Sequence, residues 1–131
     1  MTHRVLVVDD EPDIREIARL SLERLAGWTV LTASNGVEAA EVARTESVDA
    51  VLLDVMMPGT DGPSTVSMLR AEQATAQLPI VLLTAKAQAS DRQRLAELDV
   101  AGVIQKPFDP RTLADQIASL LHWRHDDGPT P

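Results

Sequence analysis

Five short apolar runs, separated by segments with helical spacing, constrain the fold of this chain more than any other feature. The runs are rich in β-branched and other aliphatic residues, which is typical of buried strands. They lie at residues 4–8, 28–33, 50–54, 79–84 and 102–106. Strands that alternate with helices pair in parallel through right-handed crossovers. The pattern therefore predicts an α/β fold in which helices cover both faces of a parallel sheet.

The segments between and after the runs predict five helices. The first begins at Pro12, which suits a helix start, and ends at Gly27, which suits a helix end. Asn35-Gly36 marks the turn before the second helix. The third and fourth helices are expected around residues 63–75 and 88–98. Apolar residues mark one face of the fifth, namely Leu113, Ile117, Leu120 and Leu121.

A doubly wound sheet of five strands most commonly has the order 2-1-3-4-5. In that order the first and third strands lie side by side, and ligands bind beyond their carboxyl ends. The length of 131 residues fits one such domain. We therefore expect one flavodoxin-like domain over residues 1–124 and a polar tail over residues 125–131.

Acidic residues stand at the two strand ends that this order brings together. Asp9 and Asp10 follow the first strand, and Asp54 ends the third. Three neighbouring carboxylates repel one another unless a cation joins them, and oxygen ligands favour Mg²⁺, with Mn²⁺ as a substitute. An alternative role for Asp9 and Asp10 is to cap the helix that starts at Pro12, and Asp10 or Asp13 could cap it as well as bind metal.

A hydroxyl and an ammonium group are expected at the same edge of the sheet. Thr84 ends the fourth strand and Lys106 ends the fifth. A metal ion and a lysine neutralise phosphoryl charge, a threonine donates a hydrogen bond, and a carboxylate can attack phosphorus in line. The five side chains together therefore predict a site for phosphoryl transfer.

The sequence resembles the receiver domains of response regulators in two-component signalling (CheY-like domains). The resemblance is carried, in order and spacing, by VLVVDDEPD at 5–13, LLDVMMPGTDG at 52–62, VLLTA at 81–85 and KPFDP at 106–110. It covers about residues 4–122. The resemblance implies a phosphorelay role, with a sensor histidine kinase or a histidine phosphotransfer protein as donor and protein–protein affinity as the output. It also implies that the domain is no enzyme beyond its own phosphorylation and slow dephosphorylation.

The resemblance assigns roles to individual residues. Asp54 matches the phosphoacceptor, and Asp10, Asp54 and the backbone carbonyl of Met56 match the direct ligands of Mg²⁺. Asp9 would act on the ion mostly through water. Thr84 and Lys106 would contact the phosphoryl group, and Lys106 would first pair with Asp54. The family also implies a cis peptide bond between Lys106 and Pro107.

One position departs from the family pattern. Receivers usually carry Tyr or Phe three residues before the lysine, where this chain has Val103. A small β-branched residue has no ring to move, so the familiar aromatic switch is not expected here. Met56 and Lys86 occupy positions that influence loss of the phosphoryl group, and Met56 cannot orient a water, which favours slow hydrolysis.

Composition excludes several other classes of function. The net charge is −8 and the basic residues are scattered, which argues against direct nucleic-acid binding. The chain has no cysteine, which removes disulfides and thiolate chemistry. No segment approaches the length of a membrane span or of a signal peptide, so a cytoplasmic location is expected.

Several alternatives remain open from the sequence. A pseudo-receiver would bind a partner without phosphorylation, and an aspartyl phosphohydrolase is disfavoured because Met56 stands where such enzymes place a second acid. An FMN site is disfavoured by acids in place of a phosphate-binding loop. The initial Met favours a stand-alone receiver over a fragment of a longer regulator. Trp123 is either a lid on the core or a partner surface. His122 and His125 are expected to belong to a fraying C-terminal tail rather than to form a pair of metal ligands.

Overall fold

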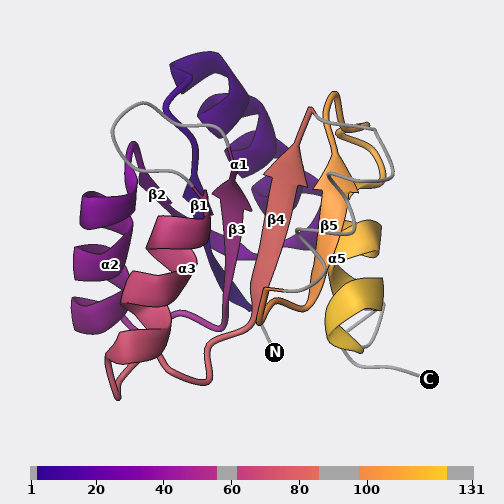
Figure 1. Ribbon diagram of the computed structural model, residues 1–131. Helices are drawn as coiled ribbons and strands as arrows, with labels where there is room; N and C mark the ends of the chain where they lie inside the picture. The colour runs from indigo at the N-terminus through magenta and orange to yellow at the C-terminus, as the bar shows by residue number, and fades with distance from the viewer. Residues whose placement is uncertain (1–2, 56–61, 86–97, 124–131) are drawn as a thin grey trace.

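The computed structural model describes residues 3–55, 62–85 and 98–123, and in these it has one parallel five-stranded sheet. The strand order is β2-β1-β3-β4-β5, which confirms the predicted order and is seen across Figure 1. All four neighbouring pairs are parallel. The strands are β1 (Arg4–Val8), β2 (Thr29–Ala33), β3 (Ala50–Asp54), β4 (Ile80–Thr84) and β5 (Gly102–Gln105).

Four helices are described, labelled α1 (Pro12–Ala26), α2 (Gly36–Thr45), α3 (Gly62–Ala71) and α5 (Leu113–Leu121). The fourth of the five expected helices, around residues 88–98, lies almost wholly outside the described residues. None of the described helices combines the length and the apolar character needed to cross a bilayer.

Some predicted boundaries were wrong by a few residues. The third helix ends at Ala71 rather than near residue 75. Residues 72–77 form turns instead, and there the buried hydroxyl of Thr75 donates to the carbonyl of Leu69. The second strand begins one residue late, because the N–H of Trp28 bonds to the carbonyl of Leu22 and completes the end of α1.

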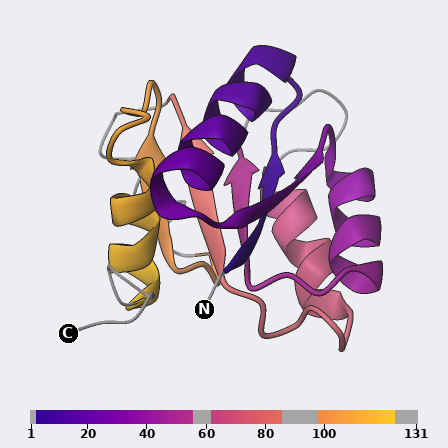
Figure 2. The same cartoon turned by 180° about the vertical axis from the view of Figure 1, so that it is seen from behind.

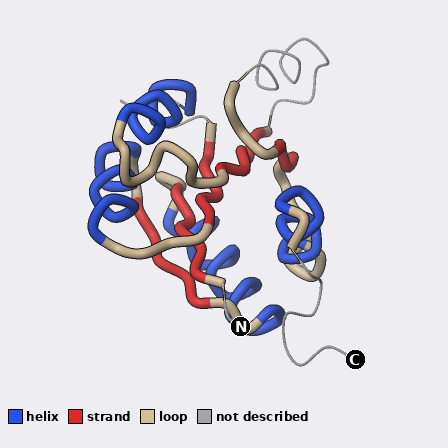
Figure 3. Tube along the Cα trace, turned by 90° about the horizontal axis from the view of Figure 1, so that it is seen from below, coloured by secondary structure: helices blue, strands red, loops and turns tan. Residues whose placement is uncertain are grey.

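Helices cover both faces of the sheet, so the domain has two apolar cores. Figures 1 and 2 show α2 and α3 on one face and α1 and α5 on the other, and Figure 3 shows the strands between the two helical layers. Successive residues of β1 serve opposite cores: Leu6 and Val8 pack with α2 and α3, and Val5 and Val7 pack with α1 and α5. The central strands β1, β3 and β4 are buried on both sides, which explains why their runs are almost wholly apolar.

The start of α1 differs from one of the sequence interpretations. The N-cap residue is Glu11, and its side chain makes no capping hydrogen bond. The alternative role of Asp10 or Asp13 as the side-chain cap of this helix was therefore wrong. Instead, the backbone N–H of Glu11 donates to Oδ1 of Asp9 at 2.9 Å. Because Pro12 has no N–H to satisfy, the helix start needs fewer caps and the acids are available for another role.

Three rings meet at the edge of the sheet where the strands begin. The rings of His3 and Trp123 are stacked with centroids 3.6 Å apart, and Trp28 meets the ring of Trp123 edge-on at 5.3 Å. His122, in the left-handed conformation, turns the chain after α5 so that Trp123 reaches this position. Trp123 also packs against the core of α1 and α5. Of the two interpretations of Trp123 offered by the sequence, the structure therefore supports a lid on the core.

We expect Trp123→Ala to lower the free energy of unfolding by about 2 kcal/mol, because the variant loses a partly buried ring and two aromatic contacts. Urea unfolding measures this difference. Leu25→Ala is the matched control, since Leu25 is 62% exposed, and it should change stability by less than about 0.5 kcal/mol. Equal effects of the two substitutions would contradict the role of Trp123 as a lid.

Candidate functional site

The functional candidates lie at the carboxyl ends of neighbouring strands. Asp9 follows β1, Asp54 is the last residue of β3, Thr84 is the last residue of β4, and Lys106 follows β5. The first three are almost fully buried, at 0%, 2% and 0% exposed. Asp10 is more open to solvent. The parallel sheet thus gathers residues that are nearly a hundred positions apart in sequence.

Lys106 joins two of the acids. Its Nζ lies 2.9 Å from Oδ2 of Asp9 and 3.3 Å from Oδ1 of Asp54, whereas Glu11 is more distant at 3.9 Å. Burial lowers the pKa of Lys106. Its hydrogen bonds to Asp9 and Asp54, together with the negative charges of these two carboxylates, raise the pKa by more, so it lies above its ordinary value. The ammonium form is therefore the form present at neutral pH.

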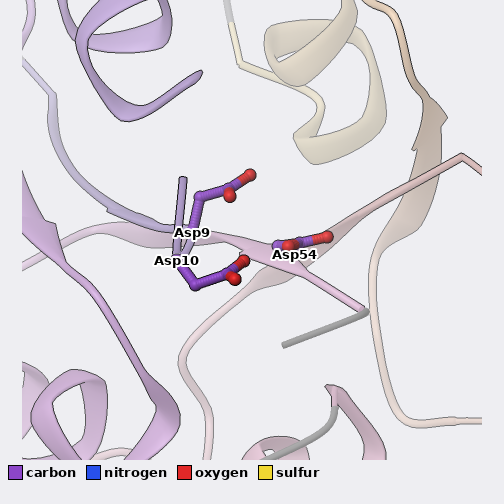
Figure 4. A group of neighbouring side chains, drawn as sticks. All are labelled: Asp9, Asp10 and Asp54. Atoms are coloured by element: carbon purple, nitrogen blue, oxygen red, sulfur yellow. The ribbon is translucent and has the colours of Figure 1, made fainter. Parts of the chain in front are cut away.

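The carboxylates of Asp9, Asp10 and Asp54 form one group. One oxygen from each lies within 4.8 Å of the others, and Figure 4 shows the three carboxyl groups side by side at the ends of β1 and β3. Three carboxylates face one ammonium, so the group keeps a net negative charge. Such an arrangement attracts a further cation.

The donor set fits Mg²⁺. Mg²⁺–oxygen bonds of about 2.1 Å in an octahedron place ligand oxygens roughly 3 to 4 Å apart, so the carboxylates need only small shifts, or one bridging water, to share an ion. Oδ2 of Asp9 is buried; it contacts Nζ of Lys106 at 2.9 Å and keeps a second lone pair. It is therefore the kind of acceptor that a cation or a metal-bound water satisfies.

Main-chain contacts tie the ends of β4 and β5 together. The N–H of Lys106 donates to the carbonyl of Thr84 at 2.7 Å, which holds the threonine and the lysine on adjacent strands. The peptide bond between Lys106 and Pro107 is cis, which is the conformation that the family resemblance implied. Val103 pairs with Leu82 and packs against the core of α2 and α3.

The structure therefore brings together Asp9, Asp10, Asp54 and Lys106, and it ties Thr84 to the lysine. The backbone carbonyl of Met56, and Lys86, lie outside the described residues. Sequence reasoning missed two other contributors at the β1–α1 junction. The N–H of Glu11 orients Asp9, and Nη1 of Arg15 donates to the carbonyl of Asp9 at 2.7 Å. No sequence pattern indicates these contacts, because they depend on how the chain turns from β1 into α1.

Sequence comparisons bear on the meaning of this arrangement. The family model described as the response regulator receiver domain matches residues 5–118. A probable transcriptional regulator of Cyanidium caldarium, ycf27, is 41% identical over 119 residues, which are 91% of this chain and 46% of that protein. The chain thus spans about half the length of the curated relatives that it matches.

Solved structures agree with the sequence comparisons. The chemotaxis response regulator CheY4 of Vibrio cholerae has a TM-score of 0.84 and 31% identity, covering 92% of this chain and 99% of that one. The receiver domain of a Pseudomonas aeruginosa PAO1 sensor histidine kinase was solved with magnesium coordinated in its active-site cleft. It has a TM-score of 0.79 and 28% identity, covering 94% of this chain and 98% of that one. The fold, the acidic site and the family match together show that this chain belongs to the response regulator receiver domain family.

Proposed function

We propose that this domain is a phosphorylation switch in which Asp54 accepts a phosphoryl group from the phosphohistidine of a histidine kinase or a histidine phosphotransfer protein. The observation that carries the proposal is the buried contact of Lys106 with both Asp9 and Asp54, at 2.9 and 3.3 Å. It places a nucleophilic carboxylate beside a fixed positive charge, which is what an arriving phosphoryl group requires.

Transfer forms one bond and breaks another. An oxygen of Asp54 forms the new O–P bond while the N–P bond of the phosphohistidine breaks, and the electron pair of that bond returns to the imidazole nitrogen. The product is an acyl phosphate on Asp54. The ammonium of Lys106 is positioned to neutralise a phosphoryl oxygen, and the hydroxyl of Thr84 is the donor on the adjacent strand.

Asp9, Asp10 and Asp54 would hold Mg²⁺, together with the backbone carbonyl of Met56 that the family pattern adds. When bound, the ion supplies charge neutralisation for the phosphoryl oxygens. In this role the domain turns over no separate substrate, since the only chemistry takes place on its own Asp54. The output is a changed affinity for a protein partner, and with Val103 in β5 it does not depend on an aromatic ring at that position.

We expect the protein to gain the mass of one phosphoryl group when it is incubated with Mg²⁺ and acetyl phosphate. Intact-protein mass spectrometry measures the gain. The added group should disappear under mild base, because acyl phosphates are labile, and should not form in EDTA. A gain that is unaffected by EDTA would contradict the metal site. No gain from acetyl phosphate or from a phosphorylated histidine phosphotransfer protein would favour a pseudo-receiver instead.

A further inference from the structure

Arg15 of α1 makes one contact of unusual consequence for the site. Its Nη1 donates a hydrogen bond of 2.7 Å to the main-chain carbonyl oxygen of Asp9, and the side chain is half-buried. Across residues 3–55, 62–85 and 98–123 the guanidinium forms no ion pair, although the acidic group lies close by in the chain. Arg19, one turn further along, pairs with Glu16 and Glu23 on the same helix.

The carbonyl that Arg15 holds belongs to the peptide between Asp9 and Asp10. Because a peptide unit is planar, fixing its oxygen also fixes the direction in which the chain enters Asp10. The carboxylate of Asp9 has its own restraints, from the N–H of Glu11 and from Lys106. In the described part of the chain, no hydrogen bond or ion pair restrains the carboxylate of Asp10. Its placement therefore depends on the backbone.

We propose that Arg15 is a positioning residue for the metal site, acting through the Asp9 carbonyl to keep the carboxylate of Asp10 facing Asp54. The inference rests on the proposed function, since it concerns the Mg²⁺ that this function requires. It differs from a role in binding the ion directly, because a guanidinium has no lone pair to offer a cation.

The charge of Arg15 and its hydrogen bond act on metal affinity in opposite directions. A positive charge near the site repels Mg²⁺, so a purely electrostatic role means that removing Arg15 tightens Mg²⁺ binding. The hydrogen bond orients a ligand, so its loss weakens Mg²⁺ binding. The direction of the change thus separates the two roles, and a purely structural role changes thermal stability without changing affinity.

The test is the dissociation constant for Mg²⁺, measured by isothermal titration calorimetry on four proteins: the wild type, Arg15→Ala, Arg15→Lys and Arg19→Ala. Thermal unfolding in EDTA is recorded for each. We expect Arg15→Ala to bind Mg²⁺ about tenfold more weakly, whereas Arg15→Lys, which can still donate to the carbonyl, stays within about threefold of the wild type. Arg19→Ala, which removes a positive charge one turn further from the acids, should bind Mg²⁺ as the wild type does.

Three results would overturn the inference: unchanged or tighter Mg²⁺ binding by Arg15→Ala, an equal loss in Arg15→Lys, or an equal loss in Arg19→Ala. If Arg15→Ala does not fold, Arg15→Gln replaces it. The glutamine side chain is shorter than arginine and cannot reach the carbonyl, so this variant should show the same tenfold loss of Mg²⁺ affinity. A wild-type protein that binds no Mg²⁺ would instead defeat the metal site of the proposed function, and the role of Arg15 would fall with it.

Discussion

Asp54→Asn should abolish phosphorylation by acetyl phosphate while the fold survives. The amide has nearly the same size and shape as the carboxylate, so the packing at the end of β3 is preserved. It lacks the charged oxygen nucleophile that the proposed phosphoryl transfer requires of Asp54. Intact-protein mass spectrometry in Mg²⁺ should show a complete loss of the phosphorylated species, and circular dichroism should show unchanged secondary structure.

Asp13→Asn is the matched control for this experiment, because it makes the same chemical change on the exposed first turn of α1. It should be phosphorylated as the wild type is. If Asp54→Asn still gains a phosphoryl group, the acceptor is another residue, and peptide mapping after borohydride reduction would identify it. Asp54→Ala is a poorer choice, because it also leaves a cavity beside Lys106.

Much of the fold followed from the sequence because strand and helix alternate with clear signals. The strand order was predictable from the number of parallel strands, and the acids of β1 and β3 then had to meet. Ends of elements were less predictable, since they depend on tertiary contacts. The buried hydroxyl of Thr75 bonds the carbonyl of Leu69, and no local pattern indicates that α3 stops at Ala71.

The candidate site was also predictable only in part, because some of its contacts depend on tertiary structure. Asp9, Asp54 and Lys106 come from strand ends, which the topology places together. The contacts of Arg15 and Glu11 depend on the angle at which α1 leaves β1, and helical periodicity alone does not fix that angle. The role of Trp123 likewise depends on His122 adopting a left-handed conformation, which is uncommon for a residue other than glycine.

Lys106→Met should be the most destabilising change at the site when no metal is present. It leaves the buried carboxylates of Asp9 and Asp54 without their shared ammonium, in a group that already carries excess negative charge. Removing one partner of a buried ion pair typically costs about 3 to 5 kcal/mol. Because the lysine still touches solvent at 14% exposure, we expect a loss near the lower value of about 3 kcal/mol, measured by urea unfolding in EDTA.

The pH dependence of this difference has a definite sign. The folded pKa of Lys106 is raised, so its contribution to stability is complete below the unfolded pKa of about 10.4 and is lost only as pH rises through the higher folded value. The gap in unfolding free energy between the wild type and Lys106→Met should therefore stay constant from about pH 7 to 9 and close only in stronger base.

A double variant separates electrostatics from packing. If unpaired charge causes the loss, adding Asp54→Asn to Lys106→Met should recover part of the stability, because one of the two stranded carboxylates becomes neutral. Adding the exposed Asp13→Asn to Lys106→Met should recover nothing. Lys106→Met that unfolds in EDTA at the same urea concentration as the wild type would show that the ion pair contributes no net stability. In that case the role of Lys106 is to offer positive charge to a phosphoryl group, and not to stabilise the fold.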